Sequence, residues 1–187
     1  MNSFQFQTVS NIISGLGSIN ELGSILQSQN YHKALLVTDQ GMIQHQLHLP
    51  ILKILDQIGL DYIIYSDIQA DPPEHLVLEA VEFAKQEQID VVIGFGGGSS
   101  MDVAKLIALL AHPQQQQHLT EIYGVNQAKA PRLALILVPT TAGTGSEVTP
   151  ISIVTTGATT KMGVVSPILY ADVAILDATF TQALPAH

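Results

Sequence analysis

Short apolar runs alternate with segments of helical spacing along most of the chain. Compact apolar runs predict buried strands at residues 33–38, 62–65, 90–94, 133–138 and 173–176. Apolar positions at helical spacing predict helices at 20–27, 49–58 and 99–111, and a further helix opened by Pro72–Pro73, where proline suits a first turn. Strands that alternate with helices predict βαβ units and a mainly parallel sheet.

The pattern is less regular near the two ends. Residues 4–8 alternate as a short strand, and we expect a short N-terminal β-hairpin. A turn at Gly15 and Gly17 precedes the helix predicted at 20–27. Residues 151–155 and 164–166 are predicted as further strands, with Gly157 in the turn between them. Residues 181–187 are predicted to start a helix or a linker, so we expect one α/β domain over 1–180 and a linker from 181 to 187.

The composition limits the kinds of partner that this chain can bind. Charged residues make up 12% of the chain, against roughly 25% in an ordinary domain, which predicts a large core or an apolar surface that meets a partner. The net charge is −9 and only seven residues are Lys or Arg, which argues against nucleic acid and against an anionic membrane surface. The chain has no Cys, so thiolate catalysis and cysteine zinc sites are excluded. No signal peptide or membrane span is visible, and we expect a cytoplasmic protein.

The first candidate site is the run Gly96-Gly97-Gly98-Ser99, which follows a predicted strand and opens a predicted helix. Glycines let the backbone approach a ligand, and the free N–H groups of a helix's first turn attract a diphosphate. Ser99 and Asp102 also have the spacing of a capping box. A tight structural turn with an ordinary cap is the alternative.

The second candidate is residues 139–147, which leave a buried strand at the end where open α/β sheets bind ligands. Its hydroxyl residues suit the lining of a flat polar ring; they are Thr140, Thr141, Thr144 and Ser146. A polar surface loop is the alternative.

Three charged residues are weaker candidates. Asp39 ends a predicted strand, where a carboxylate can accept from ribose hydroxyls and repel the 2′-phosphate of NADP, although an ordinary turn Asp explains it equally well. Lys161 could point at a cofactor or stand as a solvated turn lysine, and Lys105 has (i, i+3) spacing from Asp102. His45 and His48 are too weak a pair to predict a metal site, so we predict none.

Two motifs together resemble the iron-dependent (group III) alcohol dehydrogenase family. The pattern GGGSxxDxxK matches residues 96–105, and PTTxGTGSEVT matches residues 139–149 without a break. The resemblance implies the N-terminal, NAD-binding half of such an enzyme, with a Rossmann-like fold. It implies that Asp39 contacts the adenosine ribose and favours NAD over NADP. It also implies that Gly97, Gly98 and Ser99 hold the pyrophosphate, and that Asp102 steadies this run and approaches the cofactor. Thr140, Thr141 and Thr144 would line the adenine- and nicotinamide-side pocket, with Ser146, Lys161 and Leu176 nearby.

The family's helical C-terminal domain binds iron or zinc through one Asp and three His, and the resemblance implies that this chain is truncated before it. His187 falls in the linker and is not predicted as a ligand. The complete enzyme would transfer hydride between NAD(H) and a small primary alcohol or aldehyde, with the metal as Lewis acid. We therefore expect cofactor binding without turnover. A domain of a maleylacetate reductase or glycerol dehydrogenase type, or a non-catalytic nucleotide-binding module, are the alternatives, and a homodimer through the N-terminal edge fits the resemblance.

Overall fold

A parallel sheet forms the centre of the computed structural model, which describes residues 3–4 and 6–182. Its six strands lie in the order β1-β9-β6-β4-β2-β3, and every neighbouring pair is parallel. The strands are β1 (Asn11–Ser14), β2 (Lys33–Asp39), β3 (Asp61–Ile68), β4 (Val91–Gly96), β6 (Ala134–Pro139) and β9 (Val173–Leu176). The predicted α/β, Rossmann-like fold with a mainly parallel sheet is confirmed.

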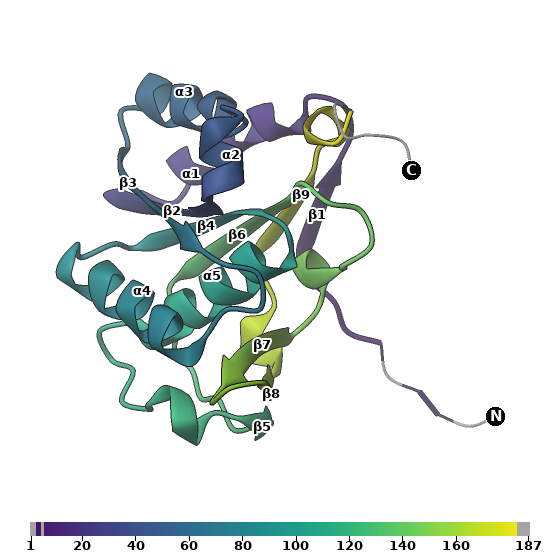
Figure 1. Cartoon of the computed structure of the whole chain (residues 1–187). Coiled ribbons are helices and arrows are strands. Elements are labelled where there is room, and N and C mark those ends of the chain that lie inside the picture. The colour runs from purple at the N-terminus through teal and green to yellow at the C-terminus, as the bar shows by residue number, and fades with distance from the viewer. Residues whose placement is uncertain (1–2, 5, 183–187) are drawn as a thin grey trace.

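Helices cover both faces of this sheet (Figure 1). Helices α1 (Leu22–Gln27) and α3 (Leu49–Ile58) lie on one face, and α4 (Glu74–Gln86) and α5 (Gly98–Leu110) on the other. Successive strand residues point to opposite faces, so Leu36 packs in the first layer and Leu35 in the second. Burial on both sides explains why the strands read as continuous apolar runs. Across the described part of the chain, no helix combines the length and apolar character needed to span a membrane.

A second, three-stranded sheet lies beside α5, at the lower edge of Figure 1. It contains β5 (Gly124–Val125), β8 (Thr160–Val165) and β7 (Ile151–Thr156), with β7 and β8 antiparallel. The strands predicted at 151–155 and 164–166 therefore form this separate sheet, and Gly157 lies in the turn between them as predicted. Short 3-10 helices complete the fold: η1 (Ser18–Glu21), η2 (Leu119–Glu121), η3 (Ser146–Val148), η4 (Pro167–Leu169) and η5 (Ala178–Phe180).

Two local predictions were wrong. The described residues of the segment 4–8 form no strand, and β1 pairs in parallel with β9, so no N-terminal hairpin exists there. Phe4 and Phe6 are 92% and 80% exposed, so the alternating pattern has no surface of this chain to pack against. The helix α2 (Gln40–Gln44) was not predicted, because Asp39 and Gly41 read as a turn. Most of the linker predicted at 181–187 lies outside the described residues.

Candidate dinucleotide-binding site

Residues 94–100 comprise the end of β4, Gly97 and the first turn of α5, and are called the glycine loop here. A Cβ at Gly94 would lie 2.7 Å from both the Ala104 Cβ and the Leu137 Cδ2, so only glycine lets α5 pack this closely on β4. Gly96 has a φ of +145°, and a Cβ there would lie 2.7 Å from the Ser100 Oγ. The loop conformation therefore depends on the absence of side chains.

The first turn of α5 is open to a ligand. Gly97 is the N-cap residue, and no side chain caps the helix. The predicted capping box of Ser99 and Asp102 is therefore wrong: Ser99 lies inside the first turn, and the Asp102 carboxylate bonds to other elements. The first N–H groups of a helix have no partner within it, and the positive end of the helix dipole lies behind them. This end of α5 can accept an anionic group.

Asp39 lies beside this open helix end. Its Oδ1 accepts from the Met42 N–H at 3.1 Å and caps α2, while the Ser100 hydroxyl donates to Oδ2 at 3.4 Å. Asp39 thus caps a helix, where the ordinary alternative was a turn Asp, and it also lines the cleft in front of the glycine loop. That cleft has a volume of about 380 Å³ and is lined by Asp39, Gln40, Gly41, Ile68, Gln69, Ala70, Gly97, Gly98, Ser99 and Ser100.

The segment that follows the neighbouring strand β6, residues 139–149, is called the threonine loop here. Thr140 donates its backbone N–H to the Gly96 carbonyl at 2.9 Å, which joins the two loops at their base. Thr141 and Thr144 lie over the glycine loop: a Cβ on Gly97 would be 3.7 Å from Thr141, and one on Gly98 would be 3.4 Å from Thr144. The hydroxyl of Thr140 is buried and has no hydrogen-bond partner among the described residues.

A second cleft of about 360 Å³ lies between the threonine loop and the ends of β1 and β9. Its lining residues are Ser14, Pro139, Thr141, Ala142, Gly143, Glu147, Leu176, Asp177, Ala178 and Thr181. The structure therefore brings half of the predicted residues into the linings of the two clefts: Asp39, Gly97, Gly98 and Ser99 line the first, and Thr141 and Leu176 line the second. The other six predicted residues line neither cleft: Gly96, Asp102, Thr140, Thr144, Ser146 and Lys161. An elongated ligand could occupy both clefts and cross the open end of α5 between them.

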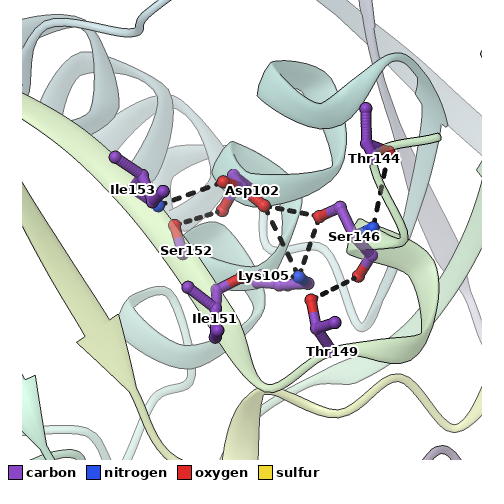
Figure 2. A network of polar contacts seen from close by, with 8 residues as sticks. All are labelled: Asp102, Lys105, Thr144, Ser146, Thr149, Ile151, Ser152 and Ile153. Atoms are coloured by element: carbon purple, nitrogen blue, oxygen red, sulfur yellow. Dashed lines mark hydrogen bonds and ion pairs between the residues drawn. The ribbon is translucent and has the colours of Figure 1, made fainter.

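A polar network lies under the threonine loop, as Figure 2 shows. The Ser146 hydroxyl donates to the Asp102 Oδ1 at 2.5 Å, and the Lys105 Nζ donates to the Ser146 Oγ at 2.9 Å and to the Ile151 carbonyl at 2.6 Å. The Ile153 N–H donates to the Asp102 Oδ2 at 3.0 Å. The hydroxyl of Ser146 and the carboxylate of Asp102, both predicted near the cofactor, are thus used inside the protein.

Lys105 is the buried charge of this network, with 0% of its side chain exposed. Burial lowers the pKa of its ammonium from the usual 10.5, and the carboxylates of Asp102 and Glu147 offset part of that effect. All the contacts of Nζ are acceptors: a hydroxyl, a carbonyl and, at 3.5 Å, a carboxylate. This environment suits the ammonium, which has three donors and no acceptor. A lysine inside an otherwise apolar helix was the sequence signal for this role.

Lys161 is placed apart from the two clefts and lines neither of them. Its Nζ lies 2.6 Å from the Asp71 Oδ1 and donates to the Thr155 Oγ1 at 2.9 Å. The side chain is 44% exposed, and Asp71 directly follows Ala70, which lines the first cleft. Lys161 therefore lies beyond the rim of that cleft.

Asp177 is a wall residue that sequence reasoning missed. Its carboxylate accepts from the backbone N–H groups of Gly17, Ile19 and Thr179, each at 3.0 Å. Burial raises the pKa of this carboxyl, but these hydrogen bonds more than offset the effect, so the pKa lies below its usual 3.8. Asp177 thus fixes the turn after β1 against the end of β9. The contacts with Gly17 and Ile19 cross about 160 positions of sequence, and no local pattern marks them.

No metal site is built by the residues that the structure describes: no group of three or more His, Asp or Glu side chains comes together there. His48 is buried, and its Nδ1 lies 3.2 Å from the Met42 carbonyl. His187 lies outside the described residues.

Known proteins resemble this chain over nearly its whole length. The family model for iron-containing alcohol dehydrogenase matches residues 10–178. The sulfoacetaldehyde reductase of Bilophila wadsworthia is 37% identical over 98% of this chain, which covers 47% of that protein. The structure of a 1,3-propanediol oxidoreductase superposes with a TM-score of 0.92 at 28% identity, over 98% of this chain and 48% of the other.

A sulfoacetaldehyde reductase from Bifidobacterium kashiwanohense, solved in complex with NAD+, superposes with a TM-score of 0.88 at 26% identity. The match covers 99% of this chain and 49% of that one. The chain spans about half the length of the curated relatives it matches.

Proposed function

Because this chain belongs to the iron-containing alcohol dehydrogenase family, we propose that it binds NAD(H) along the two clefts, the first lined by the glycine loop and the second by the threonine loop. One observation carries the proposal: the end of α5, which no side chain caps, lines the first cleft together with Asp39, and the threonine loop that lies over this end lines the second cleft. This arrangement supplies an anion site between two pockets for uncharged rings.

The proposed roles follow the chemistry of each part. The backbone of Gly96, Gly97, Gly98 and Ser99 holds the pyrophosphate at the end of α5. Asp39 accepts from the adenosine ribose hydroxyls, and its charge disfavours NADP.

The adenine and nicotinamide sides are assigned to the threonine loop and the end of β9. The unpartnered Thr140 hydroxyl, together with Thr141, Thr144 and Leu176, suits a polar ring with an apolar face. Asp102 and Ser146 support the threonine loop from beneath through their hydrogen bond. Lys161 reaches the cofactor only after leaving Asp71.

We propose that the chain binds the cofactor without turnover. Iron or zinc is expected in this family, but the described residues supply no ligand group that fits a metal, so no catalytic step is assigned to one here. Hydride transfer between the nicotinamide and a small primary alcohol or aldehyde is proposed for an enzyme with the full length of the relatives, in which this chain forms the cofactor-binding half.

The larger organisation is proposed on the same basis. We assign residues 1–180 to the NAD-binding domain and 181–187 to the start of a linker. A homodimer through the sheet edge formed by β1 is compatible with its unpaired side and with the exposed Ile12, Phe4 and Phe6. A cytoplasmic location stays a prediction.

An NADH titration of this chain, with NADPH in parallel, tests the proposal. NADH fluorescence anisotropy reports binding, and circular dichroism on the same sample reports folding. We expect saturable NADH binding and clearly weaker NADPH binding, because the Asp39 carboxylate repels the 2′-phosphate. A folded sample that binds neither nucleotide would reject the proposed function.

A further inference from the structure

Lys105 lies where three parts of the site meet. It is on α5, seven positions after the first residue of that helix, and its side chain is fully buried. Its ammonium donates to Ser146 in η3 and to the carbonyl of Ile151 in β7 (Figure 2). One side chain thereby ties the helix that starts at the glycine loop to the threonine loop and to the strand that follows it.

A short chain of contacts leads from Lys105 to the surface of the clefts. Lys105 holds the Ser146 hydroxyl, and the Ser146 N–H donates to the Thr144 Oγ1 at 3.4 Å. Thr144 in turn lies against Gly98, at the start of α5. The contact of Thr140 with the Gly96 carbonyl fixes only the beginning of the loop. The height of Thr144 over the end of α5 therefore depends on the bonds that Ser146 makes below it.

We propose that Lys105 is a positioning residue for dinucleotide binding, which acts through Ser146 to hold the threonine loop over the open end of α5. This inference rests on the proposed NAD(H) site, but Lys105 itself touches no ligand. Methionine is unbranched, only one atom shorter and offers no donor, so Lys105→Met would remove the bonds from Nζ to Ser146 and to the Ile151 carbonyl without leaving a large cavity. It would also leave Asp102 without its cation.

Two variants and a control test the proposal. If Lys105→Met leaves the loop in place for only about a tenth of the time, apparent NADH affinity falls about tenfold, because binding is reduced by the competent fraction. Ser146→Ala removes the middle link and is expected to weaken NADH binding in the same direction. After Ser146→Ala, adding Lys105→Met should weaken binding further by less than about threefold, because linked residues are not additive.

Lys33→Met is the matched control. Lys33 also forms an ion pair, with Glu87, but it lies at the start of β2, at the opposite end of that strand from Asp39. We expect it to bind NADH as the unchanged protein does. If Lys105→Met fails to fold, Ser146→Ala, which keeps Lys105 and Asp102, decides the question with the same readout.

Hydrogen exchange of the loop amides separates the two proposals. We expect faster exchange at residues 144–149 in Lys105→Met than in Lys33→Met, with or without nucleotide. If the unchanged protein binds NADH and both loop variants bind equally well, the positioning role is overturned and the NAD(H) site stands. If the unchanged protein binds no NADH, the proposed function falls; unchanged exchange at residues 144–149 would then overturn the role of Lys105 as well.

Discussion

The glycine loop and the threonine loop leave neighbouring strands at the same edge of the sheet, yet they are held in different ways. The glycine loop is shaped by its own backbone, since Gly94 and Gly96 leave no room for a Cβ. The threonine loop is held from below by side chains of α5, whose Asp102 and Lys105 lie 44 and 41 positions from Ser146. At this end of the sheet, the anion site is formed by the glycine loop and depends on residues that are neighbours in sequence. The threonine loop beside it is held in place by residues far away in sequence.

The largest expected effect comes from removing the support of the threonine loop. Asp102→Ala takes away the carboxylate that Ser146, Lys105 and Ile153 share and leaves a buried ammonium without the carboxylate that it contacts. We expect the free energy of unfolding, measured by urea denaturation, to fall by about 3 kcal/mol. Glu82→Ala is the control, because it breaks an exposed (i, i+3) pair with Lys85 on α4 and should cost well under about 1 kcal/mol. Equal losses in the two variants would show that the buried network supports nothing.

The corresponding change in the glycine loop should have a somewhat smaller effect. In Gly94→Ala the new methyl group would lie 2.7 Å from Ala104 and Leu137, so α5 must move away from β4. We expect a loss of about 2 kcal/mol in the free energy of unfolding, as for other overpacked cores. Gly163→Ala, on β8, is the control, because a Cβ there meets nothing within 4 Å. If Gly94→Ala were as stable as the control, the close approach would not shape this loop.

Asp177 tests whether support by a distant side chain also holds the turn after β1. Asp177→Asn keeps the shape but replaces one acceptor oxygen by a donor, which should cost about 1 kcal/mol near neutral pH. The folded pKa lies below 3.8, so the contribution is present above pH 3.8 and is lost as pH falls through the folded value. Urea denaturation at several pH values should therefore show the difference between the two proteins shrinking in acid. A difference that stays constant across this range would contradict the assignment.

The smallest effect on stability is expected at the rim of the first cleft. Lys161→Met breaks an exposed pair with Asp71 and should change the free energy of unfolding by less than about 1 kcal/mol. If Lys161 swings to the cofactor, the same variant should weaken NADH binding about threefold in an anisotropy titration, the effect of losing one such ion pair. Unchanged affinity would remove Lys161 from the site.

Much of the fold could be predicted because its rules are local. The spacing of apolar residues gave α3 its observed bounds, Leu49–Ile58, and the apolar run gave β9 its bounds, Val173–Leu176. The predictions failed where the structure of a segment depends on the surface that it can pack against or on a cap. The alternation at 4–8 has no partner surface, and α2 depends on Asp39 acting as a cap while Gly41 suggests a turn.

The site divides in the same way. The open helix end after the glycines could be predicted from the sequence, because strand, glycines and helix are contiguous. The failure of the predicted capping box could not be foreseen, since the Ser99–Asp102 spacing lies here inside the first turn, after the N-cap position of Gly97, and no side chain caps the helix. The internal use of Ser146 and Asp102 and the anchoring role of Asp177 depend on contacts between segments far apart in sequence.

Mapping NADH-induced shifts of the backbone amide signals by two-dimensional NMR tests the central claim most directly, because it locates the ligand on the chain. We predict that the largest shifts occur at residues 97–100, where the first turn of α5 meets the pyrophosphate, with further shifts at Asp39, Thr141 and Thr144. A folded spectrum in which these signals stay in place while NADH binds elsewhere, or in which nothing shifts at saturating NADH, would contradict the account.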